Sequence, residues 1–172
     1  MSTAVLKLAD LDEGHEINGH TEPNSNIEMK LYKGYKGLYA RKDFTAGSVI
    51  FPLKGRISRR GNKYSVQLTT DKHLDFPLIR KPNDDLHYAW QYVNHNCEPS
   101  GYVNAAEYSF CALRNIGRGE EITFNYLTTE YELASPFQCE CQSANCFGFI
   151  RGYKFLTADQ RAELSPVTSM TT

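Results

Sequence analysis

The chain has 172 residues, which is enough for one domain with its own hydrophobic core. Its 19 basic and 20 acidic side chains nearly cancel, so net charge gives no reason to expect nucleic acid or an anionic membrane as a partner. Residues 1–16 lack the basic and apolar segments of a secretory signal, and nowhere do about 18 apolar residues follow one another. We therefore expect an intracellular protein, nuclear or cytoplasmic, without a membrane partner.

Residues 1–26 are polar and show little periodicity, which favours a flexible or loosely docked N-terminal arm. Short apolar stretches that alternate with polar residues then follow, and they predict strands. Residues 86–93 could form one or two helical turns, and Thr157 is a suitable N-cap for a short helix that ends at Leu164. Many short strands and little helix predict a β-rich domain. The predicted strands lie within residues 27–31, 38–40, 49–51, 62–76, 109–116 and 121–126.

The stretch 62–76 shows the clearest alternation. Tyr64, Val66 and Leu68 are expected on one face of a strand, and Ser65 and Gln67 on the other.

A cluster of cysteines is the strongest local signal. Cys139, Cys141 and Cys146 form the pattern C-x-C-x4-C, which suits thiolate ligands of one tetrahedral Zn²⁺ ion but supplies only three of the four. Cys111 lies in an apolar strand pattern, where a free cysteine is usually a small buried hydrophobic residue, whereas Cys97 lies in a polar loop. We therefore expect Cys97 to be the fourth ligand. The alternative is free thiols or one disulfide, and the odd count of five cysteines argues mildly against a disulfide framework.

Four blocks follow one another along the chain: KGLYA at 36–40, YVNHNCEP at 92–99, GEEITFNY at 119–126, and the cysteine triplet. Together they resemble the SET-domain protein lysine methyltransferases, over roughly residues 27–152. The family has G-x-G-L-x-A, N-H-S-C-x-P, G-E-E-L-T-F-D-Y and a post-SET zinc motif in this order, and the cysteine of its second block is the fourth zinc ligand. That cysteine is Cys97 here.

The sequence departs from the family pattern at several positions. Tyr35 stands at the first glycine of G-x-G, Gln91 at a common arginine, Ser100 at a common asparagine, and Asn125 at the aspartate of F-D-Y. Residues 1–26 contain no cysteine, so they do not form a cysteine-rich pre-SET segment. These departures bear on histone specificity more than on the fold.

The resemblance implies a SET fold with a C-terminal pseudoknot and a post-SET zinc-binding segment. It divides the chain into an arm (1–26), a SET domain (27–130), a post-SET zinc segment (131–152) and a short C-terminal helix with a tail (153–172). The implied cofactors are S-adenosylmethionine and a structural Zn²⁺. The pseudoknot would bring the block at Asn94 beside the block that ends at Tyr126.

The resemblance also implies roles for single residues. Tyr126 would be the catalytic tyrosine, although a tyrosine that only closes a core strand is the alternative. The cofactor would be bound by Lys36, Gly37, Tyr92, Asn94 and His95. Phe124 is at the position where some family members have a residue that limits how many methyl groups are transferred. The alternative is that Phe124 is an ordinary core phenylalanine. Phe147 and Phe149 would either cover the acceptor channel or pack around the metal.

The implied function is the transfer of a methyl group from S-adenosylmethionine to a lysine side-chain amine of a protein, a histone tail being one candidate. Two alternatives stay open: a methyltransferase for a small-molecule amine, and a catalytically inactive SET-fold binding module. An acidic groove would favour a histone substrate. The candidate groove residues are Asp84, Asp85, Glu107, Glu130 and Glu132.

Overall fold

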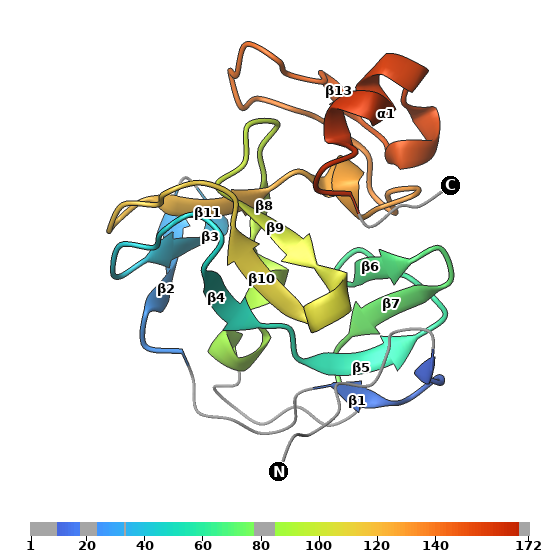
Figure 1. The fold of residues 1–172 in the computed structure, drawn as a ribbon, viewed down its shortest axis with the longest axis horizontal. Helices are drawn as coiled ribbons and strands as arrows, with labels where there is room; N and C mark the ends of the chain where they lie inside the picture. Colours follow the sequence, from blue (N-terminus) through green and yellow to red (C-terminus); the bar gives the residue numbers. More distant parts are fainter. Residues whose placement is uncertain (1–9, 18–23, 33, 78–84, 169–172) are drawn as a thin grey trace.

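The structure, a computed structural model, describes residues 10–17, 24–32, 34–77 and 85–168. Small, mostly antiparallel sheets surround a common core, and the C-terminal segment with α1 lies at one end of the molecule, at the top of the view (Figure 1). The prediction of a β-rich domain is confirmed. The strands are β1 (Glu16–Ile17), β2 (Ile27–Tyr32), β3 (Tyr35–Ala40), β4 (Val49–Pro52), β5 (Gly55–Ser58), β6 (Val66–Thr69), β7 (Lys72–Asp75), β8 (Asn94–His95), β9 (Gly101–Asn104), β10 (Ser109–Ala112), β11 (Glu121–Phe124), β12 (Phe137–Gln138) and β13 (Phe149–Ile150).

The helical elements are short. Thr157 caps α1 (Ala158–Leu164) as predicted, and Gln160 completes a capping box with it. The predicted helical turns near residue 90 are present as a 3₁₀ segment that is kinked at Tyr88. The 3₁₀ segments are η2 (Asp85–Tyr92), η3 (Ala105–Glu107), η4 (Tyr126–Thr128) and η5 (Tyr153–Phe155).

Three sheets carry most of the domain, in the strand orders β1-β5-β7-β6, β4-β10-β9 and β2-β3-β11-β8. The third sheet matters most for function, because its last pair is parallel: Asn94 pairs with Thr123 and His95 with Phe124. Residues 94–97 and 124–126 therefore lie side by side, as the resemblance implied. A fourth sheet of two strands, β12-β13, lies beyond this edge.

Two apolar clusters hold the elements together. The larger one fills the space between the sheets, and in it the rings of Phe51 and Phe110 stack at 4.9 Å. The smaller one gathers Cys97, Cys139 and nearby apolar side chains of the C-terminal segment. Tyr126 packs against both clusters, so it lies at the junction between the domain body and this segment.

Two burial patterns differ from the sequence expectation. Ser65 and Gln67 are buried although alternation placed them opposite the core side chains, because the segment at Glu130 and Tyr131 covers that face of β6 and satisfies the Gln67 polar groups. Leu31 is 72% exposed, since the β2–β3 hairpin extends past the core.

The N-terminal segment contacts the domain where it is described. β1 pairs with β5, and Leu11 and Ile17 are buried. The predicted division of the chain into four segments stays a prediction. Among the described residues, no helix has both the length and the apolar character needed to cross a bilayer.

Gly101 opens β9 directly after the Cys97 loop and has no room for a side chain. A Cβ there would meet the Phe110 ring and would lie 2.8 Å from the Cys111 carbonyl oxygen. We expect Gly101→Ala to lower the free energy of unfolding by about 1–3 kcal/mol, the usual cost of overpacking. Gly117→Ala is the control, because the nearest atom to its Cβ would be 3.9 Å away. Urea unfolding of both variants measures the difference, and equal midpoints would contradict the prediction.

Candidate active site and metal centre

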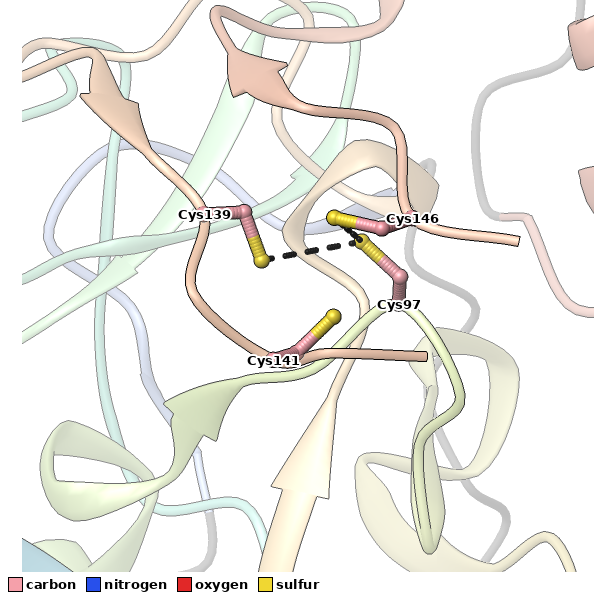
Figure 2. A group of neighbouring side chains, drawn as sticks. All are labelled: Cys97, Cys139, Cys141 and Cys146. Atoms are coloured by element: carbon pink, nitrogen blue, oxygen red, sulfur yellow. Dashed lines mark hydrogen bonds between the residues drawn. The ribbon is translucent and has the colours of Figure 1, made fainter. Parts of the chain in front are cut away.

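Four cysteines from two distant parts of the chain meet at one point. Their sulfur atoms all lie within 4.8 Å of one another, and Figure 2 shows the side chains of Cys97, Cys139, Cys141 and Cys146 pointing toward a common centre. The Cys97 sulfur is 3.8 Å from that of Cys139 and 3.9 Å from that of Cys146. A disulfide would need about 2.05 Å. The predicted ligand set is therefore assembled in space, while Cys111 is buried in β10.

The geometry of this cluster fits Zn²⁺. Four sulfurs at about 2.3 Å from a tetrahedral zinc ion lie about 3.8 Å apart, which matches the distances from the Cys97 sulfur to those of Cys139 and Cys146. The backbone N–H groups of Phe147 and Gly148 donate to the sulfurs of Cys97 and Cys146, each at 3.4 Å, and such bonds stabilise metal thiolates. The arrangement is closed by four protein ligands, so it suits a structural ion and leaves no open position for substrate.

The thiol pKa values show why a cation is needed. Burial raises the pKa of Cys97 far above its ordinary value and that of Cys139 to about 11. Burial also acts to raise the pKa of Cys141, but hydrogen bonds, first those from Ser143, outweigh it and bring the value to about 6. Without a cation the buried members stay neutral thiols. A bound Zn²⁺ would deprotonate them outright.

His95 connects the cysteine cluster to Tyr126. Its Nδ1 accepts a hydrogen bond from the Tyr126 backbone N–H at 3.1 Å, and its Nε2 lies 3.3 Å from the Cys97 sulfur. Burial lowers the pKa of His95 to about 4, so the ring is neutral. A neutral imidazole that accepts at Nδ1 carries its hydrogen on Nε2, which can then donate to the sulfur. The His95 side chain is thus occupied within the protein, and any contact with a cofactor would use its backbone.

Asn94 organises the neighbouring loop. Its Nδ2 donates to the Lys36 carbonyl oxygen at 3.0 Å and to Glu121 Oε1 at 2.9 Å. Because both bonds use Nδ2, Oδ1 can accept a bond from a ligand. Gly37 leaves room for this arrangement, since a Cβ there would lie 2.7 Å from Glu121 Oε1. The Lys36 ammonium lies over the Tyr92 ring at 5.1 Å. Lys36 thus contacts both Asn94 and Tyr92, and Gly37 and His95 are next to Lys36 and Asn94 in sequence, so the five predicted cofactor residues lie near one another.

Aromatic rings surround Tyr126. Its ring centre lies 4.8 Å from that of Phe124, 5.2 Å from that of His95 and 6.1 Å from that of Phe137. Its hydroxyl donates to the Val93 carbonyl oxygen at 3.0 Å, which fixes the direction of the phenol. Burial, with smaller effects from Glu130 and Glu121, raises the Tyr126 pKa well above its ordinary value. The phenol therefore stays protonated at physiological pH.

A hollow of about 160 Å³ opens beside this phenol. We call it the Tyr126 pocket. An apolar cavity of about 150 Å³ holds a benzene molecule, so this pocket can hold a short aliphatic amine. Its floor and walls include Trp90, Val93, Phe124, Tyr126, Glu130 and Phe137.

Sequence reasoning overlooked Phe137 as an aromatic wall of this pocket. The resemblance implied Phe147 and Phe149 either as the aromatic cover of an acceptor channel or as packing around the metal. Phe147 packs against the cysteine cluster, and Phe149 is 54% exposed. The strand pair β12-β13 instead presents Phe137 to His95 and Tyr126. A single large aromatic residue just before the cysteine triplet was the available signal.

The family departures have separate structural consequences. Ser100 is buried and its hydroxyl accepts from the Thr123 N–H at 2.9 Å, so it ties the Cys97 loop to β11. Asn125 caps η4 through its Oδ1, as an aspartate would. Tyr35 is 76% exposed at the β2–β3 turn, and Gln91 donates to the Tyr88 carbonyl oxygen.

The acidic groove candidates are scattered. Glu107 is exposed on η3, and Glu132 is exposed and pairs with Lys154. Glu130 is half-buried and lines the Tyr126 pocket. Asp84 lies outside the described residues, and Asp85 begins η2.

Comparison with known proteins agrees with the resemblance seen in the sequence. The family model described as "SET domain" matches residues 35–127. A relative from Saccharomyces cerevisiae, "Histone-lysine N-methyltransferase, H3 lysine-36 specific", is 31% identical over 137 residues, which are 70% of this chain and 18% of that protein. "Methyltransferase flvH" from Aspergillus flavus is 36% identical over 69 residues, 39% of each chain. The crystal structure of KRYPTONITE in complex with mCHG DNA and SAH superposes with a TM-score of 0.56 at 21% identity, covering 72% of this chain and 28% of that one.

The fold and site define a β-rich domain in which a four-cysteine metal centre lies beside a tyrosine-lined pocket. Because the family model takes in more than half of its residues, the chain belongs to the SET domain family. The chain spans less than a fifth of the length of the histone-lysine methyltransferases that it matches first.

The metal centre makes a direct prediction. We expect purified protein to contain about one Zn²⁺ per chain, and Cys97→Ser to lose nearly all of it, because the remaining three thiols leave the tetrahedral site open. Cys111→Ala is the matched control, since that thiol is buried elsewhere and should not change the zinc content. Elemental analysis after gel filtration measures the ratio. A full equivalent of zinc in the Cys97→Ser protein would rule out this ligand set.

Proposed function

We propose that this chain is an S-adenosylmethionine-dependent N-methyltransferase whose acceptor is a lysine side-chain amine of a protein, with histone H3 as the first substrate to test. The observation that carries the proposal is the Tyr126 pocket, an aromatic hollow beside a fixed phenol and adjoining the Asn94 loop. The names of the histone-lysine relatives support the choice of acceptor. Action on histones would place the protein in the nucleus.

The region where β3, β8 and the end of η2 meet suits the cofactor. When bound, S-adenosylmethionine supplies a methyl group on a sulfonium centre. We propose that Asn94 Oδ1 and the backbone of Lys36, Gly37 and His95 hold the polar groups of the cofactor, while the Tyr92 ring forms a wall. SAH is present in the KRYPTONITE structure, and SAH is what remains after the methyl group leaves.

Tyr126 would orient the reacting groups. Methyl transfer needs the amine, the methyl carbon and the sulfur in line, and alignment alone can lower a barrier by about 7–11 kcal/mol. The phenol of Tyr126 is held by Val93 and stays protonated, so it offers a fixed polar group and does not act as a base. The metal centre would keep β12 in place, and with it the Phe137 wall of the pocket.

The pocket also suits an amine that must be neutral to react. A lysine amine has a pKa of about 10.4 in water, and an apolar environment lowers it. Phe124 carries no hydroxyl on its side of the pocket, so we propose that there is room for more than one methyl group. The position of Phe124 between Phe110 and Tyr126 fixes that wall.

A small-molecule amine is the second candidate acceptor. The Aspergillus flavus relative is named a methyltransferase without a protein acceptor, and the aligned stretch is the same share of both chains, so the two are close in length. The Tyr126 pocket could hold a free amine as well as a lysine side chain.

The test is transfer of labelled methyl groups from S-adenosylmethionine to a histone mixture and to a pool of small amines. We expect label in protein, and we expect Tyr126→Phe to lower kcat by about 100-fold or more while cofactor affinity changes little, since it removes an orienting hydroxyl. Tyr131→Phe is the control, because Tyr131 is 48% exposed and does not line the pocket.

The outcomes separate the candidate functions. Label only in low-mass material would replace the protein acceptor with a small amine. Cofactor binding without methyl transfer to any acceptor would favour a catalytically inactive binding module. Equal rates for the two tyrosine variants would remove Tyr126 from the reaction.

A further inference from the structure

Glu130 is a half-buried titratable residue to which the proposed function gives no role. It follows η4 and lines the Tyr126 pocket, where it is the only carboxylic acid among the described lining residues. It also lines a second hollow of about 400 Å³, together with Gln67, His73 and Tyr131. Glu130 therefore borders both the Tyr126 pocket and a second, neighbouring hollow.

The carboxyl group of Glu130 is held firmly. Its Oε1 accepts from the Gln67 backbone N–H at 2.9 Å and from the Thr129 hydroxyl at 3.3 Å. Its backbone N–H donates to the Tyr126 carbonyl oxygen at 2.9 Å, and its own carbonyl oxygen accepts from the Tyr153 N–H at 2.8 Å. Both side-chain bonds end on Oε1, so Oε2 can accept a bond from a ligand.

The other ionisable groups around the two hollows leave this carboxyl without a counterion in the described part of the chain. Lys63 is exposed and its ammonium lies over the Tyr64 ring at 4.6 Å. Glu132 pairs with Lys154, and burial lowers the pKa of His73, which favours its neutral form. The nearby phenols of Tyr64, Tyr126 and Tyr131 also line these hollows. Lys63 lines the Tyr126 pocket as well, but among the described residues no ion pair to Glu130 is present.

We propose that Glu130 receives the acceptor: its carboxylate hydrogen-bonds the acceptor ammonium in the Tyr126 pocket and takes the proton that the amine must lose before methyl transfer. This inference rests on the proposed function and adds a catalytic residue to it. Tyr126 cannot take that proton, because its phenol is already protonated and donates to Val93.

The chemical step balances. One N–H bond of the ammonium breaks and one O–H bond forms on Glu130, which leaves a neutral amine and a neutral carboxylic acid. The nitrogen lone pair then forms the new C–N bond while the C–S bond of the methyl donor breaks, and its electron pair stays on sulfur. Glu130 returns its proton to water in the second hollow, and the methylated ammonium leaves.

The pKa of Glu130 suits this exchange. Burial raises it to about 7, although hydrogen bonds from Gln67 and Thr129 act to lower it. A base works best when its pKa lies near the working pH. The group must be ionised to accept a proton, so its contribution is present above about pH 7 and is lost as the pH falls through that value.

The test compares Glu130→Gln with Glu132→Gln. A glutamine keeps the oxygen that accepts from Gln67 and Thr129 but cannot take a proton. We expect Glu130→Gln to lower kcat about 100-fold at neutral pH with unchanged cofactor affinity, as for loss of a general base. Glu132→Gln removes an exposed carboxylate of the same segment and should behave as wild type.

The pH profile separates catalysis from a structural role. In wild type, kcat/KM should rise through about pH 7 and then level off. In Glu130→Gln it should keep rising toward about pH 10, because only the neutral fraction of the free amine can react. Equal profiles and rates within about two-fold for the two variants would overturn the role of Glu130 and leave the proposed function standing.

A measurement that needs no catalytic turnover tests the role of Glu130 separately from the proposed methyltransferase function. In ¹³C-glutamate NMR, one carboxyl resonance should titrate near pH 7 in wild type and in Glu132→Gln, and should be missing in Glu130→Gln. Only ordinary carboxyl titrations in all three proteins would overturn the inference. Absence of transfer by the wild type to every acceptor would overturn both proposals.

Discussion

The gathering of Cys97 with three cysteines more than forty residues further along the chain is the constraint on which the functional part of the molecule depends. Among the described residues, the smaller apolar cluster has three buried aliphatic members, Leu127, Ile150 and Leu164. Such a small core gives little stability without a metal or a disulfide. A shared ion therefore fixes this segment against the edge formed by β8 and β11.

The same site also sets the geometry around Tyr126. His95 links the Cys97 sulfur to the Tyr126 backbone, and β12 brings Phe137 over the phenol from the other side. Three groups at this site carry little charge: His95 is neutral, the Tyr126 phenol is protonated, and the pKa of Glu130 is about 7. A pocket of this kind favours a reaction that consumes a cation's proton and needs a dry, fixed geometry.

The cysteine ligands and the strands could be predicted because their signals are local. Three closely spaced thiols indicate metal, and the polar loop around Cys97 distinguishes it from Cys111 in its apolar strand. The sequence made Glu130 only one of several acidic candidates, and its place in the Tyr126 pocket depends on contacts with a segment distant in sequence. The role of Phe137 as a pocket wall likewise depends on its contacts with His95 and Tyr126. Alternation likewise misplaced Gln67, since only the tertiary fold shows that the segment at Glu130 covers that side of β6.

The separation between Cys97 and Cys146 has a consequence for synthesis in the cell. The two residues are 49 positions apart, and ribosomes add about 5–20 residues per second, so Cys97 emerges roughly 2–10 seconds before its last partner. During that interval the four-cysteine site is incomplete. For part of it, β11, the parallel partner of β8, has not been synthesised either. During this interval the Cys97 thiol can meet oxidants and competing metals, so we expect zinc supply during translation to affect how much protein acquires the complete four-cysteine site.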